Sequence, residues 1–89
     1  MMGFTEHAQD RLNEYGIPEE DVGNILKKPE RAFLDVKTGR FVAIGWWKGG
    51  KYLVVVFESY EEPVVVTVFP TGKINKVLKR VETGRWIEL

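Results

Sequence analysis

Two uninterrupted apolar runs in the middle of the chain limit the folds that this sequence can adopt. Residues 52–57 read Tyr-Leu-Val-Val-Val-Phe and residues 64–69 read Val-Val-Val-Thr-Val-Phe, with a polar turn between them. β-Branched and aromatic side chains favour strands, and runs with so little polar alternation indicate strands that are covered on both faces. The sequence therefore predicts a central hairpin, which the rest of the chain must extend or cover.

Two further strands are predicted before this hairpin. Residues 31–37 and residues 40–47 have the composition of strands, and a threonine-glycine pair between them forms a tight turn. Gly49 and Gly50 provide a two-residue link to the central hairpin, because both central residues of such a turn favour a positive φ. The four strands then form an antiparallel meander.

Two short helices are predicted ahead of the sheet. The first starts at Thr5, a good capping residue, and stops at Gly16. Its apolar stripe consists of Phe4, Ala8, Leu12 and Tyr15. The second opens at Pro18, whose ring suits a first helical turn, and stops before Pro29. Its apolar face consists of Val22, Ile25 and Leu26.

The clearest helical periodicity follows the last strand. Apolar residues recur there at positions i, i+3, i+4 and i+7, namely Ile74, Val77, Leu78 and Val81. Gly84 ends this helix, and residues 85–89 return as a short extended segment. The predicted fold class is α+β, with two N-terminal helices, a four-stranded antiparallel meander sheet and a C-terminal helix.

Length and residue usage limit the kinds of protein that this chain can be. Its 89 residues predict one domain, residues 1–89, with one core. The absence of cysteine and the single histidine exclude disulfide frameworks, thiolate catalysis and sites rich in Cys or His ligands, so no metal or cofactor is expected. No run approaches the ~20 apolar residues of a membrane span, and no secretory signal is recognised. We therefore expect a cytoplasmic protein without a membrane partner.

Charge is unevenly distributed along a chain whose net charge is zero. Residues 1–70 contain eight basic and eleven acidic residues, whereas residues 71–89 contain five basic and two acidic residues. Such asymmetry indicates an anionic partner or self-complementarity, although a solvated helix face produces it as readily.

A polar ridge on the first helix is the first candidate site. His7, Arg11 and Glu14 lie beside the apolar stripe at helical spacing. An imidazole can exchange a proton near neutral pH, and a guanidinium one turn away can hold a phosphate, so His7 and Arg11 are candidate catalytic residues. The same spacing also fits a structural role, in which Arg11 lays its stem along the core and pairs with Glu14.

The basic end of the chain is the second candidate site. Cationic side chains neutralise phosphates, and an aromatic ring beside them can stack on an unpaired base. The candidate nucleic-acid-binding residues are Lys73, Lys76, Lys79, Arg80, Arg85 and Trp86. The alternative is a solvated face, because a cationic outer surface opposite an apolar stripe is common in surface helices.

Two adjacent tryptophans in the second predicted strand must point to opposite sides of the sheet. Side chains alternate along a strand, so one of Trp46 and Trp47 enters the core while the other lies near solvent or at a contact surface. An exposed tryptophan is a good interface anchor, which makes self-association or a protein partner an open alternative.

The first half of the chain resembles a known family. Residues 4–11 read Phe-Thr-Glu-His-Ala-Gln-Asp-Arg and residues 15–22 read Tyr-Gly-Ile-Pro-Glu-Glu-Asp-Val, followed by a proline-glutamate pair at 29–30. This pattern is similar to that of a small family of uncharacterised domains placed in the RelE/ParE toxin superfamily, and residues 52–56 and 65–70 resemble its two late strands. Tyr15 stands where that family often has arginine, and Pro18 where it often has serine.

The resemblance implies a compact α+β domain and two kinds of target. Active members of the superfamily cut messenger RNA without a metal, through attack of a ribose 2′-hydroxyl on the adjacent phosphate, and members of the ParE branch poison gyrase. The leading hypothesis is therefore a toxin-type, RNA-binding domain, with metal-independent endoribonuclease activity in which His7 exchanges the proton and Arg11 offsets phosphate charge. The rival hypothesis is a non-catalytic domain that acts through protein contact, as a homo-dimer or with a small acidic antitoxin.

Both parts of the proposed active site must lie close together for the leading hypothesis to hold. We expect the first helix and the basic C-terminal segment to cover one common face of the sheet, so that a single RNA strand touches both. The distances from His7 to Arg80 and Arg85 decide this point.

Overall fold

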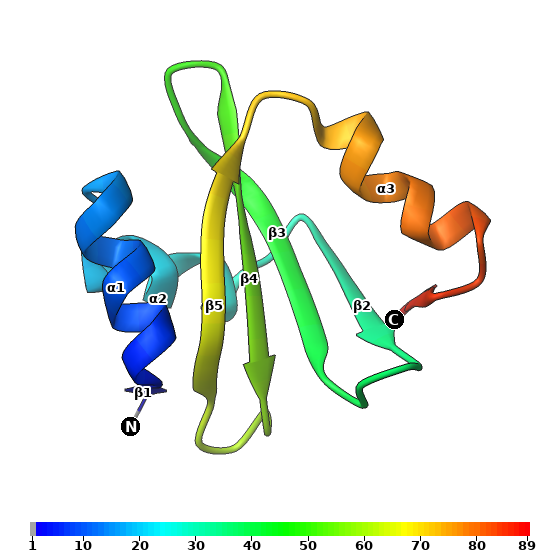
Figure 1. Ribbon diagram of the computed structural model, residues 1–89, viewed down its shortest axis with the longest axis horizontal. Coiled ribbons are helices and arrows are strands. Elements are labelled where there is room, and N and C mark those ends of the chain that lie inside the picture. Colours follow the sequence, from blue (N-terminus) through cyan, green and yellow to red (C-terminus); the bar gives the residue numbers. More distant parts are fainter. Residues whose placement is uncertain (1) are drawn as a thin grey trace.

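A six-stranded mixed sheet with helices on both of its faces forms the protein, and the computed structural model describes residues 2–89 of the chain (Figure 1). The strand order is β1-β5-β4-β3-β2-β6. The predicted α+β class is therefore confirmed. The predicted sheet of four antiparallel strands differs from the structure in strand number and in the direction of one edge strand.

The four predicted strands form the centre of this sheet. They are β2 (Arg31–Asp35), β3 (Phe41–Lys48), β4 (Lys51–Glu58) and β5 (Val64–Thr71). Neighbours along the chain pair antiparallel, as the meander prediction states. Gly49 and Gly50 link β3 to β4 with φ values of 58° and 73°, which glycine adopts without steric cost.

Two short edge strands complete the sheet. At one edge β1 (Gly3–Phe4) pairs with β5 and is parallel to it, so Phe4 belongs to a strand and not to the first helix. At the other edge β6 (Trp86–Glu88) pairs antiparallel with β2, which gives a partner to the predicted extended segment. Arg31 and Glu88 form an exposed ion pair of 2.8 Å across this last pair of strands.

The three predicted helices are present with nearly the predicted bounds. They are α1 (Glu6–Tyr15), α2 (Glu19–Lys27) and α3 (Ile74–Glu82). The Oγ1 atom of Thr5 caps α1 by accepting a hydrogen bond from the amide of Ala8, and Gly16 ends the helix with a φ of 65°. Gly84, with a φ of 79°, follows the end of α3.

The sheet separates two hydrophobic clusters, so the single predicted core is divided. Helices α1 and α2 pack on one face, and α3 packs on the other. Strand β4 serves both faces, because Leu53, Val55 and Phe57 point to α1 and α2, whereas Val54 and Val56 belong to the α3 cluster. This double cover explains why residues 52–57 are apolar without alternation.

A register shift in β5 changes which of its side chains reach each face. Val56 pairs with Thr67 and Phe57 pairs with Val65, so Val66 is an extra residue in the strand. Val65 and Val68 are both buried under α1 and α2 despite their odd spacing, and Phe69 packs with the α3 cluster. Strict alternation does not predict this arrangement.

The two tryptophans lie as alternation predicts. Trp46 is 52% exposed, and its ring packs edge-on against Tyr52 at a centroid distance of 5.4 Å. Trp47 packs against the cluster under α2 and donates its indole N–H to Asp21 at 2.8 Å.

Candidate functional site

The two predicted parts of the active site lie on opposite faces of the sheet. His7 and Arg11 are on α1, which covers one face, while Arg80 is on α3, which covers the other. The expectation that the first helix and the basic C-terminal segment share one face is therefore wrong. It fails because β4 and its neighbours are apolar on both sides, so the amphipathic α3 could pack on either.

The ridge on α1 has the arrangement of a structural arginine. Arg11 pairs with Glu14 at 2.8 Å, as the structural alternative requires. Among residues 2–89, the Nε atom of Arg11 is a buried side-chain nitrogen without a hydrogen-bond partner. His7 is exposed beside it. A single strand of RNA that reached this ridge would not reach the cations of α3.

A groove between α3 and the sheet gathers arginines from three parts of the chain. Its cavity measures about 240 Å³. Arg40 comes from the segment before β3, Arg80 from the last turn of α3 and Arg85 from the segment before β6. We call this cavity the arginine groove, and its lining residues are Asp35, Thr38, Arg40, Val42, Val56, Thr67, Phe69, Arg80, Arg85 and Trp86.

The floor of the arginine groove is the face of the sheet that α3 leaves partly uncovered. Val56 in β4 and Thr67 and Phe69 in β5 are half-buried there, beyond the side of α3. They give the groove an apolar floor with one aromatic ring and one hydroxyl, below three guanidinium groups. This combination suits a ligand that has both negative charge and flat apolar surface.

Asp35 holds one wall of the groove in place. Its carboxylate accepts hydrogen bonds from the amides of Lys37 and Thr38, from Nε of Arg85 at 3.2 Å and from the indole of Trp86 at 3.4 Å. Burial alone would raise the pKa of Asp35, but the two amides, the Arg85 charge and the indole outweigh it and lower the pKa. The carboxylate thus fixes Arg85 at the groove.

Trp86 supports an arginine and does not offer an open ring. It is 5% exposed, packs against Phe33 at a centroid distance of 5.3 Å and carries the guanidinium of Arg80 at 5.4 Å from its ring centre. The predicted stacking of a base on Trp86 therefore lacks an accessible ring face. Phe69, which is half-buried at the floor, is the aromatic side chain that a base can reach.

The three arginines of the groove are held to different degrees. Arg85 pairs with the buried Asp35, and Arg40 is 3.5 Å from the exposed Glu58, a contact of little strength. Within the described part of the chain, Arg80 has no ion pair. Its charge is the one most available to an incoming anion.

The predicted lysines divide between the two flanks of α3. Lys76 lies one turn before Arg80 on α3, and Lys73 immediately precedes the helix. Lys79 lines a different cavity together with Arg31, on the β2 side. Arg80, Arg85 and Trp86 line the arginine groove, Lys76 and Lys73 continue the basic row along α3, and Lys79 is separated from that row.

Seven of the ten lining residues of the groove were not predicted as site residues, and four of these seven matter most for its chemistry, namely Asp35, Arg40, Thr67 and Phe69. The sequence places Thr67 and Phe69 in a strand but does not show which face of the sheet they cover, because the extra residue at Val66 breaks the alternation of side chains. Asp35 and Arg40 flank the predicted threonine-glycine turn, and such turns bring the ends of two strands together. Their positions on either side of this turn were the signal that could have placed Asp35 and Arg40 in one site.

Neither a metal-binding cluster nor a helix suited to cross a membrane is found within residues 2–89. In that range no three His, Cys, Asp or Glu side chains are grouped so that they could hold a metal ion. None of the helices in the described range has the length and apolar character needed to cross a membrane.

Comparison with known proteins places the chain in a family. A family model described as a domain of unknown function, DUF4258, matches residues 4–70, which include α1, α2 and the four central strands. Searches of curated proteins and of solved structures found no match. The family model does not connect the chain with RelE or ParE toxins, so that resemblance stays a hypothesis. The chain belongs to the DUF4258 family.

Proposed function

We propose that the arginine groove binds the sugar-phosphate backbone of single-stranded RNA. The observation that carries this proposal is the convergence of Arg40, Arg80 and Arg85 over an apolar floor that includes Phe69. Guanidinium groups match phosphate geometry, and an aromatic ring under them supports an unpaired base of any identity. Lys73 and Lys76 extend the basic row along α3 and would hold the next phosphates.

The resemblance to RelE/ParE toxins supports RNA as the nucleic acid. If this resemblance reflects function, the protein is a toxin-type domain. Cleavage of RNA requires a group that removes the proton from the ribose hydroxyl. The groove contains one carboxylate, that of Asp35, and its oxygens are already occupied by Arg85, Trp86 and two amides. Because His7 lies across the sheet, the proposed activity is binding and not cleavage.

Fluorescence anisotropy with a labelled oligouridine of about twelve nucleotides tests the proposal, a length within the site sizes of small single-strand binders. Arg80→Gln keeps much of the side chain but removes its charge, and binding should weaken by about fivefold or more. Lys79→Gln is the matched control, because it removes one cation from the other flank of the same helix. Equal affinities of the two variants would overturn the proposal.

A second candidate function is protein contact through the edge strand β6. Ile87 in β6 is 53% exposed and Leu89, which follows the strand, is 63% exposed, and the outer edge of β6 has no partner among residues 2–89. Exposed apolar edge strands pair readily with other chains. A homo-dimer or an antitoxin-like partner would cover them. Ile87→Lys should then abolish association measured by sedimentation, and a wild-type protein that stays monomeric at high concentration would exclude the homo-dimer.

A further inference from the structure

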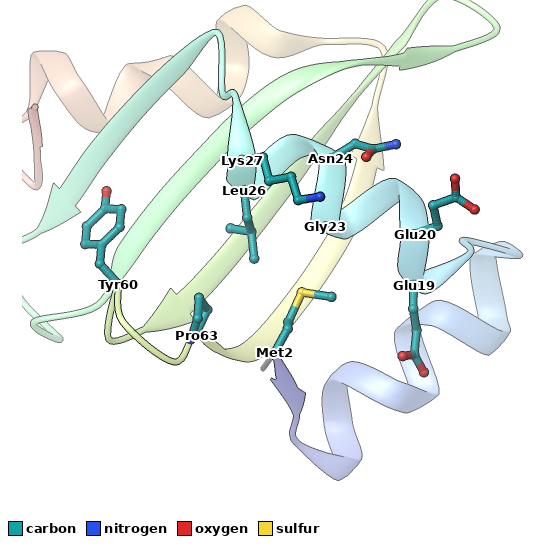
Figure 2. Close-up of a pocket in the computed structure, with 9 residues that line it drawn as sticks. All are labelled: Met2, Glu19, Glu20, Gly23, Asn24, Leu26, Lys27, Tyr60 and Pro63. Carbon is teal, nitrogen blue, oxygen red and sulfur yellow. The ribbon is translucent and has the colours of Figure 1, made fainter.

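A cavity lies along α2, on the face of the sheet opposite the arginine groove. It measures about 490 Å³. Figure 2 shows its floor, where Met2, Leu26 and Pro63 lie between Tyr60 at one end and the first turn of α2 at the other. We call it the α2 groove; its lining also includes Glu19, Glu20, Gly23, Asn24 and Lys27.

Acidic residues line one end of the α2 groove and are next in sequence to the lining residues of the other end. Glu19 and Glu20 lie at the N-terminal end of α2, as Figure 2 shows. At the other end Glu61 and Glu62 are exposed in the turn between Tyr60 and Pro63, which themselves line the groove. Lys27 is the one cation in the described lining, so acidic groups outnumber it. An apolar floor between two acidic ends attracts a ligand with the opposite arrangement.

Tyr60 adds a polar group at its end of the groove. Its ring packs on Phe41 and Phe57 at centroid distances of 4.6 and 5.1 Å, which fixes the side chain while leaving it 52% exposed. Burial of part of the phenol raises the pKa of Tyr60, so the hydroxyl stays protonated at neutral pH and can donate a hydrogen bond.

Gly23 keeps the middle of the groove open. It lies inside α2, where a glycine costs about 1 kcal/mol relative to alanine. A β-carbon built at this position would lie 3.6 Å from the Cε atom of Met2, an ordinary contact. A methyl group therefore fits there, whereas a longer side chain at position 23 would occupy the space above Met2.

We propose that the α2 groove docks a segment of a partner protein that has an apolar anchor between two cationic side chains. Charge complementarity selects this occupant, because Glu19 and Glu20 line one end of the groove and the exposed acidic turn of Glu61 and Glu62 lies between the lining residues Tyr60 and Pro63 at the other. A helix of nine residues is about 13 Å long, and an extended chain rises about 3.3 Å per residue, so roughly five residues span the groove. The acidic antitoxin of the rival hypothesis has the wrong charge for this surface.

The anchor and the cations have separate tasks. The apolar side chain removes Met2, Leu26 and Pro63 from water, which supplies most of the affinity. The cations pair with Glu19 or Glu20 at one end and with Glu61 or Glu62 at the other, which fixes the position of the segment and makes its binding sensitive to salt. The inference does not depend on RNA binding, since the two grooves lie on opposite faces.

The test titrates the ¹⁵N-labelled protein with three pentapeptides and follows its amide resonances. The first has arginine at both ends, leucine in the centre and alanine between them. The second replaces leucine with alanine, and the third replaces both arginines with glutamate. The first should shift the amides of Leu26 and Tyr60, and the second should bind about tenfold more weakly because the anchor is lost. The third should bind more weakly still.

Two variants at Gly23 separate occupation of the groove from folding. Gly23→Leu fills the groove and should abolish the shifts caused by the first peptide. Gly23→Ala is the matched control, because it also strengthens α2 but adds a single methyl group, and it should keep the shifts. If Gly23→Leu does not fold, Glu19→Gln with Glu20→Gln gives an independent measurement, with an expected loss of up to roughly fivefold, because the cation at that end loses both of its possible partners.

Several results would overturn the inference. These are equal binding of the arginine and glutamate peptides, equal shifts in Gly23→Leu and Gly23→Ala, or shifts confined to Arg80 and its neighbours. A wild-type dimer that Gly23→Leu dissociates would also overturn it, because a second copy of the chain would then be the occupant. None of these results affects the oligouridine measurement, so failure of the two proposals can be told apart.

Discussion

At the scale of single residues, Asp35 shows how one buried carboxylate organises a surface. It joins the end of β2 to Arg85 and Trp86 through hydrogen bonds that span fifty residues of sequence. An acid at the end of a strand ordinarily faces water, and nothing local to residues 31–40 reveals its distant partners. The sequence therefore predicts the strand and the turn around Asp35 but not its role.

Asp35→Asn should destabilise the protein at neutral pH, by about 1–3 kcal/mol, because charged hydrogen bonds to Arg85 and to two amides become neutral ones. The pKa of Asp35 is lowered in the folded state, so its contribution is fully present above the unfolded pKa of about 3.9. It is lost as the pH falls through the lower folded value. Urea denaturation should thus show a large difference between variant and wild type at neutral pH, and this difference should shrink as the pH falls below about 3.9. A difference that does not change with pH would contradict the assignment.

Thr5 makes a second long connection with one hydroxyl. It accepts from the amide of Ala8 at 3.1 Å and donates to the carbonyl of Val66 at 3.0 Å, so the start of α1 is tied to the extra residue of β5. Thr5→Val keeps the shape and should cost about 1–2 kcal/mol in the free energy of unfolding, since a helix cap and a part-buried carbonyl lose their partner. Thr5→Ser retains the hydroxyl and should cost much less. Equal losses in the two variants would contradict a dominant role for the hydroxyl.

At the scale of elements, the sequence predicts the existence of each helix better than its position. The apolar spacing from Ile74 to Val81 shows that α3 packs on the sheet, and the structure confirms the helix. Because β4 is apolar on both faces, the spacing contains no information about which face α3 covers. The face that α3 covers depends on the connection after β5 and on the pairing of β6 with β2. This pairing joins residues that are far apart in the sequence.

The glycines of α2 and β3 give opposite predictions for the same substitution. Gly23→Ala should raise the free energy of unfolding by about 0.5–1 kcal/mol, because the helix gains a better former and the new methyl meets Met2 at an ordinary 3.6 Å. Gly45→Ala should lower it by about 1 kcal/mol, because the new β-carbon would lie 2.5 Å from Cδ1 of Ile25 and the end of that side chain must shift inside the packed cluster under α2. Urea denaturation of both variants measures the two effects. Destabilisation by Gly23→Ala would show that α2 tolerates no side chain at that position.

At the scale of the whole molecule, folding turns a charge asymmetry along the chain into one between the faces. The basic residues after position 71 gather around α3, while Glu19, Glu20 and the acidic turn at Glu61 and Glu62 lie on the side of α2. A net charge of zero therefore does not prevent a local field at the arginine groove. The sequence revealed the asymmetry, but only the strand order showed that it separates two surfaces.

This separation predicts how RNA binding depends on salt. For single strands the slope of log affinity against log salt is about −0.7 for each phosphate contact, whatever the net charge of the protein. The double variant Lys73→Gln with Lys76→Gln should therefore reduce the slope by about 1.4 between roughly 50 and 200 mM salt. The matched double variant Lys27→Gln with Lys28→Gln removes the same charge from the opposite side and should leave the slope unchanged. If both variants change the slope equally, the RNA responds to total charge, and the row on α3 is not its site.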